Sequence, residues 1–160
     1  MITLQKFGPP DYSTLINWVD NPEFLMQFAG PAFSFPLTAV QLDALASDAS
    51  KHLFKVVDEQ EKTIGHAEIH LTENSCYLAR IVIGEPQLRG RGLGKLIVRE
   101  LLEYAFINLG QPKVELTVFD WNTSAIKCYE KLGFVLNPAK RRECVVNGKT
   151  WVALGMFLEK

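Results

Sequence analysis

The sequence predicts a mixed α+β domain, in which helices flank one central, mixed and mostly antiparallel sheet. Segments with strand-like alternation of apolar residues lie before, between and after amphipathic segments of helical period. An Asn147–Gly148 pair between two apolar-rich segments predicts a tight hairpin near the C-terminus. No linker, repeat or change of composition divides the 160 residues, so we expect residues 1–160 to form a single domain.

The first third of the chain is expected to contain one strand and three helices. The strand covers Ile2–Phe7, and Asp11 is placed to cap a helix over Tyr12–Val19. The Asn-Pro pair that follows ends this helix, and a short second helix covers Glu23–Phe28. A capping box predicts a third helix over Thr38–Asp48.

Three strands are predicted next, over His52–Asp58, Thr63–Leu71 and Cys76–Gly84. The third contains the apolar run Ile81-Val82-Ile83, which is typical of a central strand buried on both faces. This run therefore predicts that the third strand lies inside the sheet.

The strongest helix signal covers Leu93–Leu109, where apolar residues recur on one stripe. A strand over Val114–Phe119 and a helix over Thr123–Leu132 follow, and Gly133 is placed to end that helix.

Composition and charge narrow the classes of function. The formal net charge of −1 gives no broad basic surface for nucleic acid. Three cysteines with no zinc-site spacing predict reduced thiols in a cytoplasmic protein. We expect no signal peptide and no membrane span, because no apolar segment is long enough. Positive charge clusters around Arg89–Lys95 and at Lys140–Arg142, and a solvated surface is the simpler interpretation of the second cluster.

The most informative segment is Gln87–Lys95, a glycine-rich turn between a predicted strand and a predicted helix. Its alternating glycines, Gly90, Gly92 and Gly94, allow close approach of the backbone to a ligand. Main-chain N–H groups and the positive end of the helix dipole would then face a phosphate, assisted by nearby cations. The segment predicts a site for a ligand with a pyrophosphate and a further phosphate.

Two other phosphate motifs fit this segment less well. A dinucleotide fingerprint requires a glycine where Lys95 stands. A P-loop requires a serine or threonine where Leu96 stands and a glycine where Arg89 stands. A turn that serves packing alone would not explain the adjacent cations.

Two segments carry a resemblance to a known family. Gln87-Leu88-Arg89-Gly90-Arg91-Gly92 resembles motif A of the GNAT superfamily of acyl-CoA N-acyltransferases, and Asn122–Phe134 resembles its second signature. The order of strands and helices from Ile2 to Leu158 also resembles that fold. The early segment Asn17–Pro22 resembles the branch with ribosomal-protein, polyamine and antibiotic acetyltransferases.

The resemblance implies that acetyl-CoA binds as co-substrate and that no metal takes part. The implied pyrophosphate contacts are Leu88, Arg89, Gly90, Arg91, Gly92, Leu93, Gly94 and Lys95. Free main-chain groups of Val82 and Gly84, with Ile83 between them, would pair with the pantetheine arm. Gly84 departs from the valine that is frequent in the family, which matters little if the contact uses main chain.

Asn122 and Tyr129 match residues of the second signature. Asn122 would help to bind the cofactor, although the same side chain could instead cap the following helix. Tyr129 would act as general acid for the departing thiolate, although its ring could also serve core packing.

The general base is less defined. The position that carries a glutamate in several branches is Thr117, and Glu115 lies two residues away on the same strand face. Glu68 is our first choice as a tentative base, in the alternating segment His66–His70, for which a metal site is the weaker interpretation. Glu85, next to the glycine-rich loop, is a third option.

The function expected is transfer of an acetyl group to a primary amine of a small molecule or a peptide N-terminus, by direct attack in a ternary complex. The alternative is a non-catalytic sensor that binds an acyl-CoA. The expected partners are the amine substrate, no nucleic acid and no membrane, in a monomer or a homodimer. The acceptor site would form between the first three helices and the C-terminal hairpin, where Phe24, Phe28, Phe33 and Phe35 either line it or pack in the core.

Overall fold

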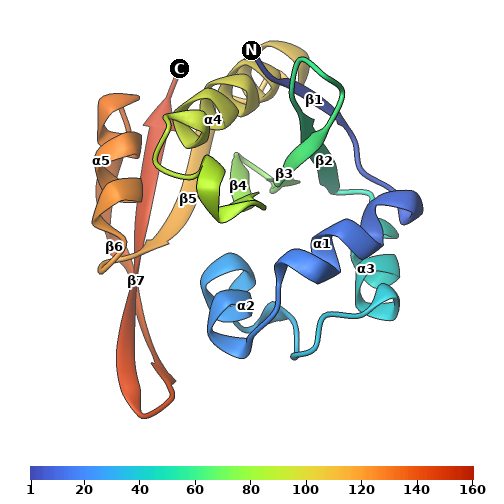
Figure 1. The fold of residues 1–160 in the computed structure, drawn as a ribbon. Helices are drawn as coiled ribbons and strands as arrows, with labels where there is room; N and C mark the ends of the chain where they lie inside the picture. The colour runs from blue at the N-terminus through green and yellow to red at the C-terminus, as the bar shows by residue number, and fades with distance from the viewer.

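The computed structural model describes residues 1–160 and contains one seven-stranded sheet with helices on both faces (Figure 1). The strands are β1 Thr3–Lys6, β2 Lys51–Val57, β3 Thr63–Leu71, β4 Cys76–Ile83, β5 Lys113–Phe119, β6 Val135–Val146 and β7 Lys149–Glu159. The helices are α1 Tyr12–Trp18, α2 Pro22–Ala29, α3 Ala39–Ala46, α4 Leu93–Glu103 and α5 Thr123–Lys131. Short 3-10 turns η1 Pro9–Asp11, η2 Gly30–Ala32 and η3 Pro86–Leu88, and a π-helical turn η4 Tyr104–Asn108, complete the elements.

The strands follow the order β1-β2-β3-β4-β5-β7-β6 across the sheet. All neighbours are antiparallel except β4 and β5, which run parallel. That parallel pairing covers only three residue pairs, Cys76–Leu78 of β4 against Val114–Leu116 of β5. Beyond Leu78 the two strands part, and the gap between them creates the main cleft of the molecule.

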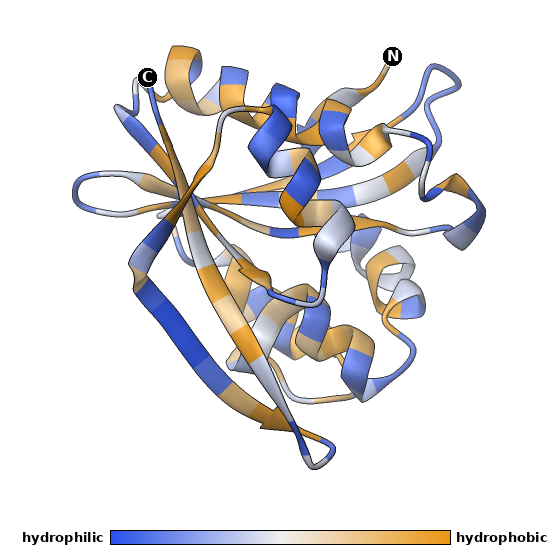
Figure 2. Ribbon diagram, turned by 90° about the vertical axis from the view of Figure 1, so that its left-hand side faces the viewer, coloured by the Kyte–Doolittle hydropathy of each residue, from blue (hydrophilic) through white to orange (hydrophobic).

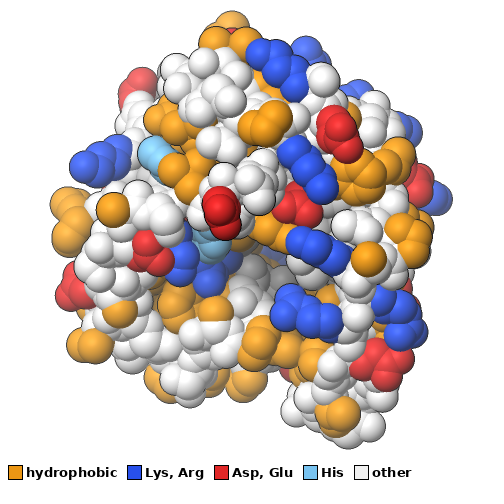
Figure 3. Space-filling model, turned by 180° about the vertical axis from the view of Figure 1, so that it is seen from behind, with side chains coloured by type: hydrophobic (Ala, Val, Ile, Leu, Met, Phe, Trp, Pro, Cys, Tyr) orange, Lys and Arg blue, Asp and Glu red, His pale blue; other side chains and the backbone are white.

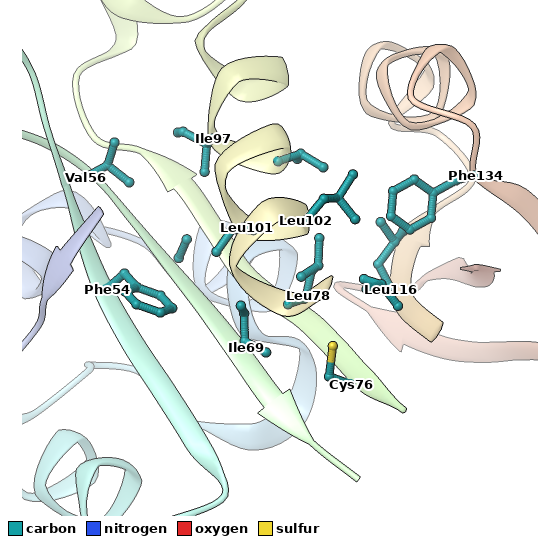
Figure 4. Close-up of a cluster of buried hydrophobic side chains, with 14 of the residues drawn as sticks. Phe54, Val56, Ile69, Cys76, Leu78, Ile97, Leu101, Leu102, Leu116 and Phe134 are labelled. Carbon is teal, nitrogen blue, oxygen red and sulfur yellow. The ribbon is translucent and has the colours of Figure 1, made fainter. Parts of the chain in front are cut away.

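Two apolar cores hold the helices to opposite faces of the sheet. The stripe of α4 packs on one face, where Ile97 and Leu101 are fully buried against β-strand residues such as Ile69 (Figure 4). A second core, with Leu15 and Leu42 at its centre, joins α1, α2 and α3 to the other face. The predicted helices are therefore confirmed, and α1 to α4 each bury apolar residues against the sheet, whereas the apolar residues of α5 are only partly buried.

The helix starts show which capping predictions hold. The Thr38 hydroxyl accepts from the Gln41 N–H at 3.4 Å, as the capping box predicts. Asp11 does not cap α1; its carboxylate instead accepts from the Gly8 N–H at 2.9 Å and pairs with Lys55 at 3.2 Å. Asp11 thus fixes the turn before the helix and ties it to β2.

The prediction that Ile81-Val82-Ile83 is buried on both faces is correct only for Val82. Ile81 and Ile83 are half-buried, because β5 no longer covers this end of β4. A β-bulge at Arg80, with φ of 48°, shifts the register against β3 and turns the strand at the point where it leaves β5. A local apolar run could not reveal this departure of the neighbouring strand.

The predicted hairpin connects β6 and β7. Asn147 and Gly148 have φ values of 51° and 76°, as the tight turn requires. The pairing of β6 with β7 is interrupted between Asn137 and Arg141, where β6 bulges. After this bulge β6 carries a hydrophilic stretch, visible as its blue segment in Figure 2.

Candidate active site

A cleft of about 1320 Å³ lies where β4 and β5 part. Its lining residues come from both faces of the sheet. We call the part formed by the glycine-rich loop, α4 and α5 the α4 side. We call the part formed by α2, His70, Tyr77, Arg80, Lys140 and Arg142 the α2 side. The gap between the strands joins the two sides, so two ligands can meet from opposite faces.

The glycine-rich loop on the α4 side has the geometry that a phosphate requires. Gly90 and Gly92 have φ values of 75° and 81°, and no atom lies within 4 Å of a β-carbon built on either. The first intrahelical bond of α4 runs from the Leu96 N–H to the Gly92 carbonyl at 3.3 Å. The N–H groups of Leu93, Gly94 and Lys95 therefore have no partner within the helix and are available to an anion.

The cations around this loop differ in part from those expected. Arg89 turns back, donating to the Ile83 carbonyl at 3.0 Å and to the Gly84 carbonyl at 3.3 Å, and so fixes the loop to the end of β4. Arg91 is exposed and does not line the cleft, whereas Lys95 does. Lys127 and Lys131 of α5 also line this side, and sequence reasoning missed both. Their spacing of four on a predicted helix was the available signal.

The main-chain groups along the open edge of β4 belong to residues other than the two predicted. The Gly84 N–H donates to the Ile64 carbonyl of β3 at 2.9 Å, so Gly84 faces β3. Adjacent residues of a strand direct their main-chain groups to opposite sides, and Val82 pairs with β3 as well. The prediction for Val82 and Gly84 is therefore corrected by one residue, to Ile81 and Ile83.

The structure also explains why position 84 is a glycine. A β-carbon at Gly84 would lie 1.9 Å from the Trp18 ring, so the indole of α1 occupies that space. Trp18 and Gly84 thus fit together and set the distance between α1 and the end of β4.

Tyr129 and Asn122 both line the cleft on the α4 side. The half-buried Tyr129 ring packs edge-on against Phe134 at 5.8 Å between centroids, so packing and access to the cleft coexist. Burial raises the pKa of the Tyr129 phenol to about 12, with a smaller contribution from Cys128. The Asn122 side chain makes no capping bond to α5, so the alternative role of helix cap is wrong.

Glu68 lies beneath the α2 side and is fully buried. Its carboxylate accepts from His66 Nε2 at 2.9 Å, from His70 Nε2 at 2.6 Å and from an Arg80 guanidinium nitrogen at 2.6 Å. Burial by itself raises the pKa of this carboxyl, but the bonds from both histidines and the Arg80 charge outweigh it and hold the pKa well below its usual range.

This geometry is unfavourable for Glu68 as the direct proton acceptor that we expected. Glu68 does not line the cleft, and its strongest partners already use both oxygens. A carboxylate with a depressed pKa is also a weak base. The residues between Glu68 and the cleft are His70 and Arg80, which both line it. The side chains of the His66–His70 segment bind one another, and no group of residues suited to a metal ion occurs in the structure.

The other two candidate bases are also engaged away from the cleft. Glu115 accepts from the Ser75 hydroxyl at 2.6 Å and pairs with Lys140 at 3.2 Å. Burial raises the pKa of Glu115, but these partners and Lys113 outweigh it and lower the pKa overall. Glu85 pairs with Lys62 at 2.5 Å on the surface. None of the three carboxylates lines the cleft.

Of the remaining residues considered for the acceptor site, some line the cleft and others do not. Phe24 and Phe28 line the α2 side, and the Phe33 ring lies 4.7 Å from the Arg80 guanidinium. Phe35 is 42% exposed and does not line the cleft. The Lys140–Arg142 cluster, interpreted as solvated surface, is exposed but forms one wall of the cleft. The cluster is far from the glycine-rich loop in sequence, so local patterns could not predict that it lines the same cleft.

A comparison with known protein families gives a match to the sequence model of the acetyltransferase (GNAT) family over residues 16–134. This range includes both the glycine-rich loop and the segment around Tyr129. The chain belongs to the GNAT acetyltransferase family. It is an acetyltransferase that uses acetyl-CoA, and both predictions of the sequence are confirmed.

Several relatives of this acetyltransferase match along most of its length. Spermidine N(1)-acetyltransferase of Vibrio cholerae is 30% identical over 152 residues, which cover 92% of this chain and 87% of the relative. Acetyltransferase PseH of Campylobacter jejuni is 26% identical over 140 residues, covering 85% and 86%.

A solved structure confirms the GNAT fold. The crystal structure of spermidine N-acetyltransferase from Vibrio cholerae, in complex with CoA and spermine, superposes with a TM-score of 0.82 and 25% identity. The match covers 99% of this acetyltransferase and 95% of the solved chain. None of the helices in the present structure is long and apolar enough to cross a membrane.

Proposed function

We propose that the protein transfers the acetyl group to a primary amine of a small molecule or a peptide N-terminus, by direct attack in a ternary complex. The observation that carries the proposal is the cleft, which opens on both faces of the sheet where β4 and β5 part. Acetyl-CoA supplies the thioester when it is bound. The amine then reaches the same gap from the α2 side, without passing the cofactor.

The α4 side fits the phosphates of coenzyme A. The open cradle at Gly90 and Gly92 leaves room for a phosphate beside the unpaired N–H groups at the start of α4. Lys95, Lys127 and Lys131 surround it with positive charge. Asn122, free of any capping role, faces the same space.

The pantetheine arm would extend along the open edge of β4. Ile81 and Ile83 direct their main-chain groups to that edge, and β5 does not cover them. The Ile83 carbonyl already accepts from Arg89, which leaves the Ile83 N–H and both groups of Ile81. These groups can bind the amides of the arm as an additional strand would.

Tyr129 would stabilise the departing thiolate. With a pKa of about 12 the phenol is protonated at neutral pH, so it can donate to sulfur. The ordinary thiol pKa of about 8.5 is lower, so a strong hydrogen bond is favoured over complete proton transfer. Burial also raises the pKa of the Cys128 thiol, which makes this cysteine a weak nucleophile and supports direct attack rather than a cysteine relay.

His70 is our candidate for the group that receives the proton of the amine, with Glu68 as its positioning residue. His70 is the only histidine that lines the cleft, and its Nε2 is bound to Glu68 at 2.6 Å. When that nitrogen carries the proton, Nδ1 is left as the acceptor. Glu68 then selects the tautomer, as a buried carboxylate does for catalytic histidines.

The experiment is release of free thiol from acetyl-CoA with a panel of amines that includes amino acids, amino sugars, polyamines and short peptides. Amine-dependent release is expected, and binding of acetyl-CoA without release for any amine would instead support the sensor. His70→Gln tests the base: kcat should fall by about 100- to 10,000-fold, the usual contribution of general base catalysis, and recover in part as pH rises. His52→Gln, remote from the cleft, is the matched control.

We also infer that the protein works in the cytoplasm. Its three cysteines are unpaired, as is usual for proteins in a reducing compartment.

A further inference from the structure

The charge of the cleft wall bears on the acceptor. Of the 36 residues that line the cleft, none is aspartate or glutamate. The α2 side presents the cations Arg80, Lys140 and Arg142. Lys and Arg side chains are gathered beside the hollow in Figure 3. The lining of the cleft itself therefore carries positive charge and no carboxylate.

Two of these three cations are held in place by carboxylates behind the wall. Arg80 is paired with the buried Glu68 at 2.6 Å, and Lys140 with the buried Glu115 at 3.2 Å. Hydrogen bonds to the Tyr77 hydroxyl and to Glu115 raise the pKa of Lys140, which keeps it cationic. These carboxylates orient the cations but do not themselves face the ligand.

Arg142 differs because it has no acidic partner. It is exposed, lines the cleft and takes part in none of the ion pairs of the chain. Its guanidinium is thus available to bind an anion with two parallel hydrogen bonds.

Coenzyme A does not account for the cations of the α2 side. Its phosphates have their own cations at the glycine-rich loop and α5, on the opposite face of the sheet. A polyamine does not fit the α2 side either, since no carboxylate is present to receive its ammonium groups and the cations would repel them.

Resting on the proposed function, we infer that the acceptor is a small molecule that carries an anionic group, a carboxylate or a phosphate, beside its amine. Arg142 binds the anion, and Lys140 and Arg80 extend the same positive wall. This wall also assists the reaction, since nearby cations disfavour the ammonium form of the substrate. The amine loses its proton to His70 and its nitrogen forms the new bond to the acetyl carbon as the bond to sulfur breaks.

The test measures thiol release from acetyl-CoA with matched pairs of amines. Leucine against leucinamide tests a carboxylate, glucosamine 6-phosphate against glucosamine tests a phosphate, and spermidine serves as the polycation. In at least one pair the anionic member should have a kcat/KM at least about tenfold higher, as one charged hydrogen bond provides. The pair that shows this preference identifies the anion.

Variants locate the anion site. Arg142→Gln should reduce the preference by about tenfold through the KM of the anionic member, and leave the member that lacks the anion unchanged. Arg99→Gln removes an exposed arginine of α4 outside the cleft and should leave the preference intact. A higher kcat/KM for spermidine or for the members that lack the anion, or a preference that survives in Arg142→Gln, would overturn the inference. If no amine is acetylated at all, the result would instead contradict the proposed function, on which this inference rests.

Discussion

Tyr129→Phe isolates the role of one hydroxyl group. The ring keeps its contact with Phe134, and the hydroxyl makes no hydrogen bond within the chain, so the variant should fold with nearly unchanged stability. A hydrogen bond to a charged acceptor contributes about 1.5–3 kcal/mol. If that bond forms only as the thiolate departs, its loss lowers kcat by about 10- to 160-fold. Affinity for acetyl-CoA should hardly change.

The assay is steady-state thiol release from pH 6 to 10, with acetyl-CoA affinity measured by calorimetry. The Tyr129 phenol is expected to stay protonated throughout, since its pKa of about 12 lies above this range. Tyr104→Phe is the matched control, because Tyr104 packs on Phe54 at 5.0 Å between centroids and does not line the cleft. A kcat of Tyr129→Phe equal to that of the wild type at every pH would refute the reasoning.

Four further predictions concern the cofactor site and the buried carboxylate. Gly92→Glu should abolish CoA binding, measured by calorimetry. Gly110→Glu should preserve it, because Gly110 is also an open glycine with positive φ but is remote from the cleft. Equal loss of binding in both variants would show that Gly92 is not part of the phosphate site. CoA at about 100 times its Kd should stabilise the fold by about 2.7 kcal/mol and raise Tm, and ATP should not; equal protection by ATP would favour a nucleotide site. Glu68→Ala should lower the free energy of unfolding in urea by about 3–5 kcal/mol, because Arg80 would be left buried without its partner; a loss below about 1 kcal/mol would contradict this. Since the native pKa of Glu68 is depressed, its stabilisation is complete above the ordinary value of 4.5 and should fade as pH falls below it, with a weaker acid dependence in Glu68→Gln.

The elements of the fold were accessible from sequence because their signals are local. Hydrophobic period, caps and turn residues gave the bounds of β3 and the start of α4 as observed, and Asn147–Gly148 gave the hairpin, whereas the predicted end of the helix at Leu109 lies beyond the observed end of α4 at Glu103. The π-helical turn at the end of α4 and the bulge at Arg80 escaped, because neither has a distinctive local pattern.

The candidate active site was predictable only where its residues lie within one local motif. The glycine-rich loop and Tyr129 were identified because each lies within a contiguous motif. The alternation of His66, Glu68 and His70 was visible in the sequence, but the burial of Glu68 was not, because it depends on contacts with both histidines and Arg80 that form only after β3 and β4 pair.

The sequence by itself determined the order of the elements, since short-range periodicity encodes it. Motif spacing also identified the glycine-rich loop and Tyr129 as candidate site residues. Only the tertiary structure decided how β4 and β5 part, which main-chain groups stay free, and that Lys140–Arg142 faces the cleft. Each of these depends on contacts between segments far apart in the chain, and packing of the sheet and its helices is what brings those segments together.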